Sequence, residues 1–361
     1  MAANCDHQAF FAGFTQRHPV FAPSSSPAYS NVAYQILAYA LEGIAGKPFA
    51  TLLNKDLIQK LRLGDTSYTT PKDWSHGVIP GTAQSSQWNL SIGDEGPAGG
   101  IYSSTTDMST LGISILSSKL LGPTQTRRWL KPVTHTSNLL VSVGAPWEIY
   151  RLQLNDRVSD LYTKDGGLGV YLSQLVLAPD WDIGFITLSA GLSSNYADIT
   201  VLIATQFLPA VETAARLEAD AVYSGHYTNP QVNSSMTITT DPSHPGLGVT
   251  SWISRGVDMF PLVASVGLGN PTANVSIRLY PTQLTTTSSN GDTRVGFRAV
   301  FEDYAQSDES GTLGLGCLSW GGLDTTKYGG VSFDDFNFVV GSDGIAKSLE
   351  PRALRVSLAK Q

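Results

Sequence analysis

Charged side chains are scarce in this sequence. They make up 15% of its 361 residues, with 23 basic against 30 acidic groups and a formal net charge of −7. The chain has no run of lysine and arginine, whereas a protein that binds nucleic acid needs a cationic face to neutralise phosphates. We therefore expect no nucleic acid as a main ligand.

Long apolar runs are also absent. The best stretch, residues 199–211, is interrupted by Thr205, Gln206 and Pro209 and is shorter than the roughly 18–20 residues that span a bilayer. We expect no membrane-spanning segment. The first residues have neither the basic nor the apolar part of a secretory leader, so composition alone leaves the compartment open.

Cysteine is nearly absent, with Cys5 and Cys317 close to opposite ends of the chain. The two could pair, but they form neither a disulfide framework nor a metal-ligand pattern. No two of the six histidines have helical metal-site spacing with an acidic partner, and we expect no metal or other cofactor. Three glycosylation sequons, at Asn89, Asn233 and Asn274, are about as many as chance gives in a chain so rich in Ser and Thr.

The length and a hydrophobic fraction of 42% suffice for about two domains with buried cores. Helical periodicity predicts helices over residues 31–45, 107–120 and 197–219, and β-branched runs at 168–177 and 183–188 predict a hairpin. From about residue 220 the pattern changes to short runs of period two with hairpin turns such as Asn290-Gly291. We predict a mixed α/β (α+β) domain over residues 1–215 and an all-β sandwich or barrel over residues 220–361.

A candidate catalytic segment, Pro27-Ala28-Tyr29-Ser30-Asn31, immediately precedes the first predicted helix. If this segment is extended, Tyr29 and Asn31 project to the same side. A phenol can shuttle protons only if its pKa falls from about 10 toward neutrality, and nearby cations favour that fall. The alternative is that Tyr29 packs at the helix entrance and that Asn31 caps the helix.

A second segment, Lys164-Asp165-Gly166-Gly167, leads into the predicted hairpin. Lys164 can supply the cation that such a phenol needs, and the two glycines remove side chains where a substrate would lie close to the strand. The alternative is a solvated turn before a strand. Between the two segments, residues 97–108 contain a Gly-rich turn into the second helix, which we interpret as structural.

The order Tyr-x-Asn, then Ala-Gly-Gly-x-Tyr-Ser-x-x-x-Asp-Met, then Lys-x-Gly-Gly with a hairpin resembles the serine β-lactamase and penicillin-binding-protein superfamily, in its class C-like and esterase-like branch. The β domain resembles that of fungal secreted β-lactamase-like proteins. The resemblance implies an antiparallel sheet with flanking helices, with the strand of Lys164 at its exposed inner edge. It also implies secretion and a serine hydrolase or acyltransferase that acts through an acyl-enzyme.

The resemblance assigns roles to individual residues. Tyr29 matches the catalytic tyrosine that works with lysines as general base and acid, and Asn31 matches a residue that hydrogen-bonds the substrate and helps to fix the lysine. Lys164, Asp165 and Gly166 match the Lys-Thr-Gly triplet, whose lysine orients the tyrosine and attracts anionic substrates. Backbone groups of this strand, which continues through Gly167, then hold the acyl portion of a small-molecule or peptide-like substrate.

The sequence departs from the family pattern at two points. Asp165 replaces a hydroxyl residue, and a carboxylate there would repel an anionic ligand, which favours neutral esters, thioesters or amides over β-lactams. The nucleophilic Ser-x-x-Lys does not occur among the 28 residues before Tyr29, which predicts an N-terminally incomplete domain. We therefore expect a chain that is inactive or weakly active.

The one Ser-x-x-Lys of the sequence is Ser357-Leu358-Ala359-Lys360. It is either a relocated nucleophile or the polar end of the last strand with an unanchored terminus, and we favour the second interpretation. No Gly-x-Ser-x-Gly elbow offers another nucleophile. Two alternatives stay open: a non-catalytic binding protein that uses the cleft or the β domain, and an active transacylase of secondary metabolism with a truncated gene model.

Overall fold

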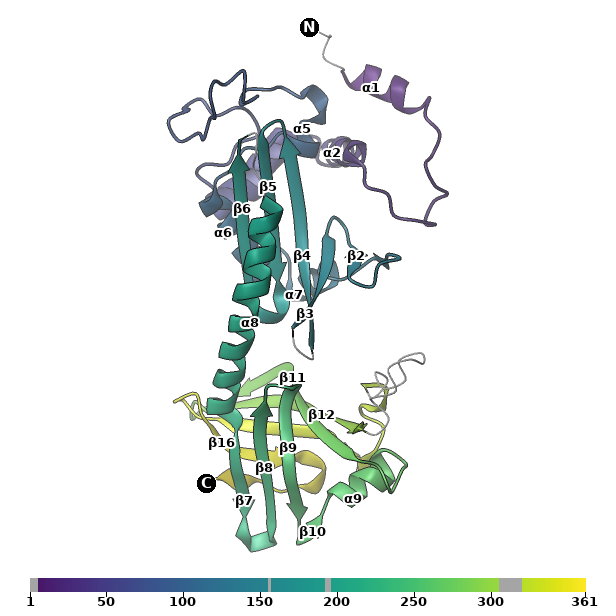
Figure 1. The fold of residues 1–361 in the computed structure, drawn as a ribbon, viewed down its shortest axis with the longest axis vertical. Helices are drawn as coiled ribbons and strands as arrows, with labels where there is room; N and C mark the ends of the chain where they lie inside the picture. Colours follow the sequence, from purple (N-terminus) through teal and green to yellow (C-terminus); the bar gives the residue numbers. More distant parts are fainter. Residues whose placement is uncertain (1–5, 155–156, 192–195, 305–319) are drawn as a thin grey trace. The chain divides into compact units, whose positions relative to one another are not determined.

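The computed structural model describes residues 6–154, 157–191, 196–304 and 320–361. Both cysteines, Cys5 and Cys317, lie outside these residues. The chain divides into an N-terminal unit, made of Met1–Leu154 and Val158–Leu208, and a C-terminal unit, made of Asn155–Arg157 and Pro209–Gln361 (Figure 1). Each unit has its own sheet and its own apolar core.

The first half of the N-terminal unit is helical. Its helices are α1 (His7–Phe14), α2 (Asn31–Ala45), α3 (Phe49–Leu53), α4 (Gln59–Leu61), α5 (Gly96–Gly99), α6 (Thr105–Leu116) and α7 (Pro123–Trp129), with a π-helical turn η1 (Asn54–Ile58) and a 3₁₀ turn η2 (Gly93–Glu95). Among the described residues, no single helix has the length and apolar character to cross a membrane. Only α2 taken together with the helical segment Phe49–Leu61 passes that test, as a pair bent by 80°.

The predicted helix over residues 31–45 is confirmed as α2. Ser30, not Asn31, is its N-cap, because the Ser30 hydroxyl accepts a hydrogen bond from the Ala33 amide at 3.2 Å. Gly46 ends the helix in the left-handed conformation, with a φ of 63°. The second helix, predicted over residues 107–120, forms as α6 over Thr105–Leu116, so both of its ends lie earlier than predicted.

A six-stranded sheet follows, in the order β1-β2-β3-β4-β5-β6. Its strands are β1 (Thr134–His135), β2 (Val141–Val143), β3 (Glu148–Leu154), β4 (Arg157–Leu168), β5 (Tyr171–Ala178) and β6 (Ile183–Ala190). The strand pairings described for it are antiparallel. The β5–β6 hairpin, with the 3₁₀ turn η3 (Pro179–Trp181) between its strands, confirms the predicted hairpin.

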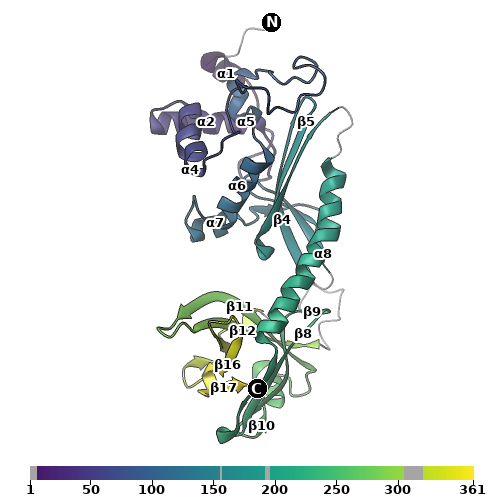
Figure 2. The ribbon, with the colours of Figure 1, turned by 90° about the vertical axis from the view of Figure 1, so that its left-hand side faces the viewer.

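Helices cover both faces of this sheet. Ile115 of α6 packs with Leu175 on one face, while Ala204 and Leu208 of α8 (Tyr196–Tyr223) pack with Val176 on the other. In Figure 2, β4 and β5 accordingly lie between α6 and the first part of α8. The predicted fold class, an antiparallel sheet with flanking helices, is therefore confirmed for this unit.

The strand that carries Lys164 is not an edge strand, contrary to the expectation, because β4 lies between β3 and β5. β3 has 7 residues and β4 has 12, and Glu148 at the start of β3 already lies beside Thr163, whose hydroxyl donates to the Glu148 carbonyl oxygen at 2.9 Å. The end of β4 from Lys164 onward therefore extends beyond β3. Among the described strands, this end pairs only with β5.

The C-terminal unit is a closed antiparallel barrel. Its strands follow the order β9-β11-β12-β15-β16-β17-β7-β8, β8 pairs back onto β9, and β10 adds to β9. They are β7 (Gly225–Asn229), β8 (Ser234–Asp241), β9 (His244–Ser254), β10 (Val257–Asp258), β11 (Val275–Thr287), β12 (Thr293–Asp303), β15 (Asp335–Val340), β16 (Ala346–Pro351) and β17 (Leu358–Lys360). Buried Trp252, Phe336 and Phe338 help to fill its core. The all-β prediction is confirmed. Of the two predicted architectures, a sandwich or a barrel, the structure shows the barrel.

Short elements complete the C-terminal unit. They are η4 (Pro230–Val232), α9 (Phe260–Leu262), the π-helical turn η5 (Val263–Gly267), the two-stranded ribbon of β13 (Lys327–Tyr328) with β14 (Val331–Ser332), and η7 (Arg352–Leu354). The chain end is anchored, because β17 pairs with β16 and β7 and the Gln361 amide donates to the His226 carbonyl oxygen at 2.9 Å. The expectation of an unanchored terminus was wrong.

Candidate active site

Tyr29 and Asn31 lie on the same side of the segment that enters α2. The Tyr29 hydroxyl donates a hydrogen bond to Asn31 Oδ1 at 2.9 Å. Tyr29 is 69% exposed, so its phenol is accessible to a ligand in this structure. The amide of Asn31 thereby fixes the position of the phenol oxygen.

Lys164 reaches this pair from β4. Its ammonium nitrogen lies 5.0 Å from the centre of the Tyr29 ring, within the range of a cation–π interaction. The same nitrogen donates to Glu148 Oε1 at 2.6 Å and to the carbonyl oxygen of Asp165 at 3.0 Å. The structure thus brings Tyr29, Asn31 and Lys164 together in one group, which we call the Tyr29–Lys164 group.

Lys164 is a cation in this group. Burial acts to lower the pKa of Lys164, but the hydrogen bond and charge of Glu148, with smaller contributions from Tyr29 and Tyr34, outweigh burial and raise this pKa above its ordinary value. At neutral pH Lys164 is therefore an ammonium ion. It can orient Tyr29 and stabilise negative charge, but it is not poised to accept a proton.

Tyr34 is a neighbour of this group that was not predicted from the sequence. Burial raises the pKa of Tyr34, Tyr29 and Glu148 add to the rise, and Lys164 opposes it. Tyr34 is therefore a neutral phenol at neutral pH. Tyr34 lies three residues after Asn31, so the two residues share one face of α2. This helical spacing is the sequence signal from which Tyr34 could have been found.

Glu148 was not predicted from the sequence either. A signal existed, because residues 148–154 and 157–163 are two alternating runs joined by a short connection, the pattern of a β-hairpin. Such a hairpin brings Glu148 level with Thr163, next to Lys164. What the pattern does not reveal is that Lys164 turns toward the strand end where Glu148 lies.

The carboxylate of Asp165, predicted to be a substrate-binding residue, contacts β5 rather than the Tyr29–Lys164 group. Successive residues of a strand point to opposite faces, so Asp165 faces away from the side of Lys164. Gln174, its register partner on β5, donates to Asp165 Oδ1 at 2.6 Å, and Thr200 of α8 donates to Gln174 Oε1. Asp165 therefore links β4, β5 and α8.

Gly166 and Gly167 have packing reasons of their own to be glycine. A β carbon on Gly166 would lie 2.5 Å from Ser173 Oγ, and one on Gly167 would lie 3.3 Å from a methyl carbon of Leu172. Both neighbours come from β5, the adjacent strand. The space beside Gly166 is therefore filled by a protein hydroxyl, whatever role this strand has toward a ligand.

Ser357 belongs to the C-terminal unit, whereas Tyr29 and Lys164 belong to the N-terminal unit. The carbonyl oxygen of Ser357 accepts from Asn229 Nδ2 at 3.0 Å, and Lys360 Nζ donates to the carbonyl oxygen of Val222 at 3.1 Å. Lys360 is thereby engaged at the end of α8. These contacts match the structural interpretation of the Ser-x-x-Lys sequence.

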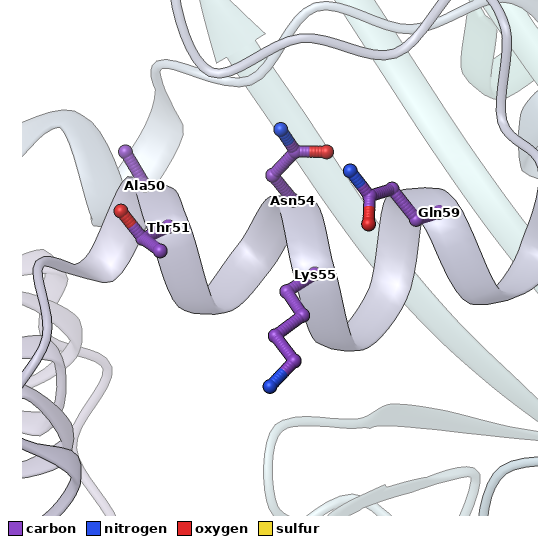
Figure 3. Close-up of a pocket in the computed structure, with 5 residues that line it drawn as sticks. All are labelled: Ala50, Thr51, Asn54, Lys55 and Gln59. Atoms are coloured by element: carbon purple, nitrogen blue, oxygen red, sulfur yellow. The ribbon is translucent and has the colours of Figure 1, made fainter.

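Two surface depressions lie elsewhere. One, of about 500 Å³, is lined by Ala50, Thr51, Asn54, Lys55 and Gln59. Figure 3 shows that these side chains project from successive turns of one helical segment, formed by α3, η1 and α4, so the depression is a surface feature. The other, of about 200 Å³, lies in the C-terminal unit beside Asp334 and Phe301. Neither is lined by Tyr29 or Lys164.

Two family models match the chain. The Beta-lactamase family matches residues 2–205, which is more than half of the chain, and the family described as "Beta-lactamase-like-like, C-terminal domain" matches residues 215–361. The chain therefore belongs to the Beta-lactamase family.

Two fungal relatives illustrate this membership. A "Beta-lactamase-like protein" of Arthroderma benhamiae is 30% identical over 93% of this chain and 61% of its own length. A "Probable hydrolase M10" of Phoma sp. is 27% identical over 72% of this chain and 44% of its own length. The chain thus spans less than two thirds of these relatives. A solved class C β-lactamase from Rhodobacter sphaeroides, 17% identical, aligns over 58% of this chain and 68% of its own with a TM-score of 0.47.

Proposed function

We propose that the N-terminal unit carries the proton-transfer part of a serine acyl-transfer site. In the complete reaction, a serine hydroxyl attacks the carbonyl of an ester, thioester or amide, and Tyr29 accepts its proton and passes it to the leaving group. Water or another acceptor then releases the acyl group. The Lys164 ammonium stabilises the phenolate form of Tyr29, which exists before Tyr29 accepts the serine proton and again after it has passed that proton to the leaving group.

One observation supports this proposal most directly. The ammonium of Lys164 lies 5.0 Å from the Tyr29 ring, and the phenol oxygen is held by Asn31 at 2.9 Å. A phenol that exchanges protons needs a fixed cation nearby and a partner that positions its oxygen. Tyr29 comes from the segment that enters α2, Asn31 is the first residue of α2, and Lys164 comes from β4.

The Tyr29–Lys164 group does not itself contain the attacking serine. The one Ser-x-x-Lys of the 361 residues is at Ser357, in the C-terminal unit. We propose that the chain by itself turns over acyl substrates weakly or not at all, since loss of a catalytic nucleophile costs on the order of 10⁶ in turnover. The Tyr29–Lys164 group then still binds an acyl ligand.

A non-catalytic binding protein is the second candidate. The 69% exposure of Tyr29 favours it, because an exposed aromatic ring beside a cation and an amide can hold a ligand without any reaction. Secretion, implied by the family resemblance, suits either function.

The test treats the 361-residue chain with a fluorophosphonate probe, reads the intact mass, and measures binding of N-acetylphenylalanine amide by ligand-observed NMR. We expect no stoichiometric adduct, and binding that weakens in Lys164→Met and Tyr29→Ala. A stoichiometric adduct on a single serine would overturn the proposed inactivity. Binding that neither substitution changes would overturn the assignment of the site.

A further inference from the structure

The Lys164 ammonium has little hydrogen-bonding capacity left for a ligand. An ammonium group has three N–H donors. Two of them are used within the protein, at 2.6 Å to Glu148 Oε1 and at 3.0 Å to the carbonyl oxygen of Asp165. The Tyr29 ring lies at 5.0 Å from the same nitrogen. A ligand therefore meets a lysine that is already engaged.

The charge of Lys164 is also compensated. Its ion pair with Glu148 is partly shielded from solvent, with side chains 24% and 29% exposed, so water screens it less than a fully exposed pair. Glu148 therefore offsets the positive charge of Lys164 that an anionic ligand would otherwise meet.

We infer that Glu148 is a specificity-determining residue, which makes the Tyr29–Lys164 group select uncharged acyl ligands over ligands that carry a carboxylate. This inference rests on the proposed function and names the substrate class of that site. A free lysine at this position would attract a substrate carboxylate. Glu148 takes the place of that carboxylate, so an anionic ligand must displace it or bind against its charge.

The test uses two probes of nearly the same shape, N-acetylphenylalanine and N-acetylphenylalanine amide, with dissociation constants measured by saturation-transfer NMR on the full chain. The wild-type protein should bind the amide more tightly than the acid. Glu148→Gln keeps the size of the side chain and removes its charge. It should raise the affinity for the acid by roughly tenfold and change that for the amide little, as expected for loss of one nearby like charge.

Two further variants separate specificity from a structural effect. In the double variant Glu148→Gln with Lys164→Met the gain for the acid should disappear, because no cation is left to bind it. Asp292→Asn removes the acid of another lysine ion pair, 2.9 Å from Lys347 in the C-terminal unit, and should alter neither affinity. Thermal melting of each variant identifies any that has lost its fold.

The outcomes distinguish this inference from the proposed function. The inference would be overturned if the wild-type protein bound the acid more tightly than the amide. It would also be overturned if a folded Glu148→Gln variant had no higher affinity for the acid. Either result would leave the proposed binding site unaffected. Binding of neither probe would overturn the proposed function, and the inference with it.

Discussion

Lys164 and Glu148 form an ion pair of 2.6 Å where β4 extends past the start of β3. The pair ties the end of one strand to the beginning of its neighbour, at the place where β4 loses β3 as a partner. It also holds the ammonium beside the Tyr29 ring. The same contact therefore affects both stability and the chemistry of the site.

The ion pair should make stability depend on pH in the alkaline range. Since the folded pKa of Lys164 lies above the ordinary 10.5, the pair stabilises the fold fully below that pH and loses its effect as pH rises through the folded pKa. Because the pair is partly exposed, its contribution is about 1 kcal/mol at most. The free energy of unfolding of the wild type should exceed that of Lys164→Met at pH 8, and the difference should shrink by pH 11.5.

The measurement is urea unfolding of both proteins across that range. Glu148→Gln should behave like Lys164→Met, because either change removes the same pair. A difference that stays constant from pH 8 to pH 11.5 would contradict this account.

Gly166→Ala should destabilise the N-terminal unit. Its new β carbon would lie 2.5 Å from Ser173 Oγ, so this hydroxyl must rotate away, and we expect a loss of about 0.5–1.5 kcal/mol. Adding Ser173→Ala should restore most of the loss, since the next nearest atom, Ser173 Cβ, is 3.9 Å away. Chemical unfolding of the single and double variants measures both effects.

Gly43→Ala is the matched control for this pair of variants. Gly43 lies inside α2, and a β carbon there would meet nothing within 4 Å. The change should stabilise the protein by about 0.5–1 kcal/mol, the usual gain of alanine over glycine in a helix. Equal effects of Gly166→Ala and Gly43→Ala would rule out the proposed clash.

Arg278→Ala should be strongly destabilising for the barrel. The guanidinium is buried and donates to Asp241 Oδ2 at 2.6 Å and to the carbonyl oxygens of His244, Pro245 and Gly246. Removing it leaves these acceptors without their donor, at a cost of about 3–5 kcal/mol. Thermal or urea unfolding of the full chain shows whether the C-terminal unit melts earlier.

Arg294→Ala provides the comparison for Arg278→Ala. Arg294 pairs with Glu350 at 3.3 Å on the barrel surface, where an ion pair contributes about 0–1 kcal/mol. A similar loss of stability in the two arginine variants would mean that the hydrogen bonds of Arg278 contribute no more to stability than a surface ion pair.

Local sequence patterns were sufficient for most elements. The apolar period of α2 and the following Gly46 defined that helix, and Asn290-Gly291 marked the hairpin of β11 and β12, where Gly291 has a φ of 86°. Barrel closure was not predictable in this way. It depends on the pairing of β8 with β9 and of β17 with β7, and β17 and β7 are far apart in the sequence. No local pattern specifies such a pairing.

The candidate site was predictable only in part. Tyr29, Asn31 and Lys164 came from motif order, and the structure places them in one group. Asp165 was assigned to the same site because it is adjacent to Lys164 in the motif, although strand alternation already argues that neighbours face opposite sides. Glu148 was missed because no sequence pattern shows that the Lys164 side chain turns toward the start of β3, where Glu148 lies.

Asp165→Asn distinguishes the two acidic residues near Lys164. Because the Asp165 carboxylate accepts from Gln174 at 2.6 Å, its replacement should cost about 1.5–3 kcal/mol of stability, the range for a hydrogen bond to a charged group. The preference for N-acetylphenylalanine amide over the acid should change much less than in Glu148→Gln, since Asp165 faces α8 and not the Tyr29 ring. Paired NMR titrations of the two variants measure this difference. A larger shift of preference in Asp165→Asn than in Glu148→Gln would mean that Asp165, and not Glu148, controls the charge selectivity of the site.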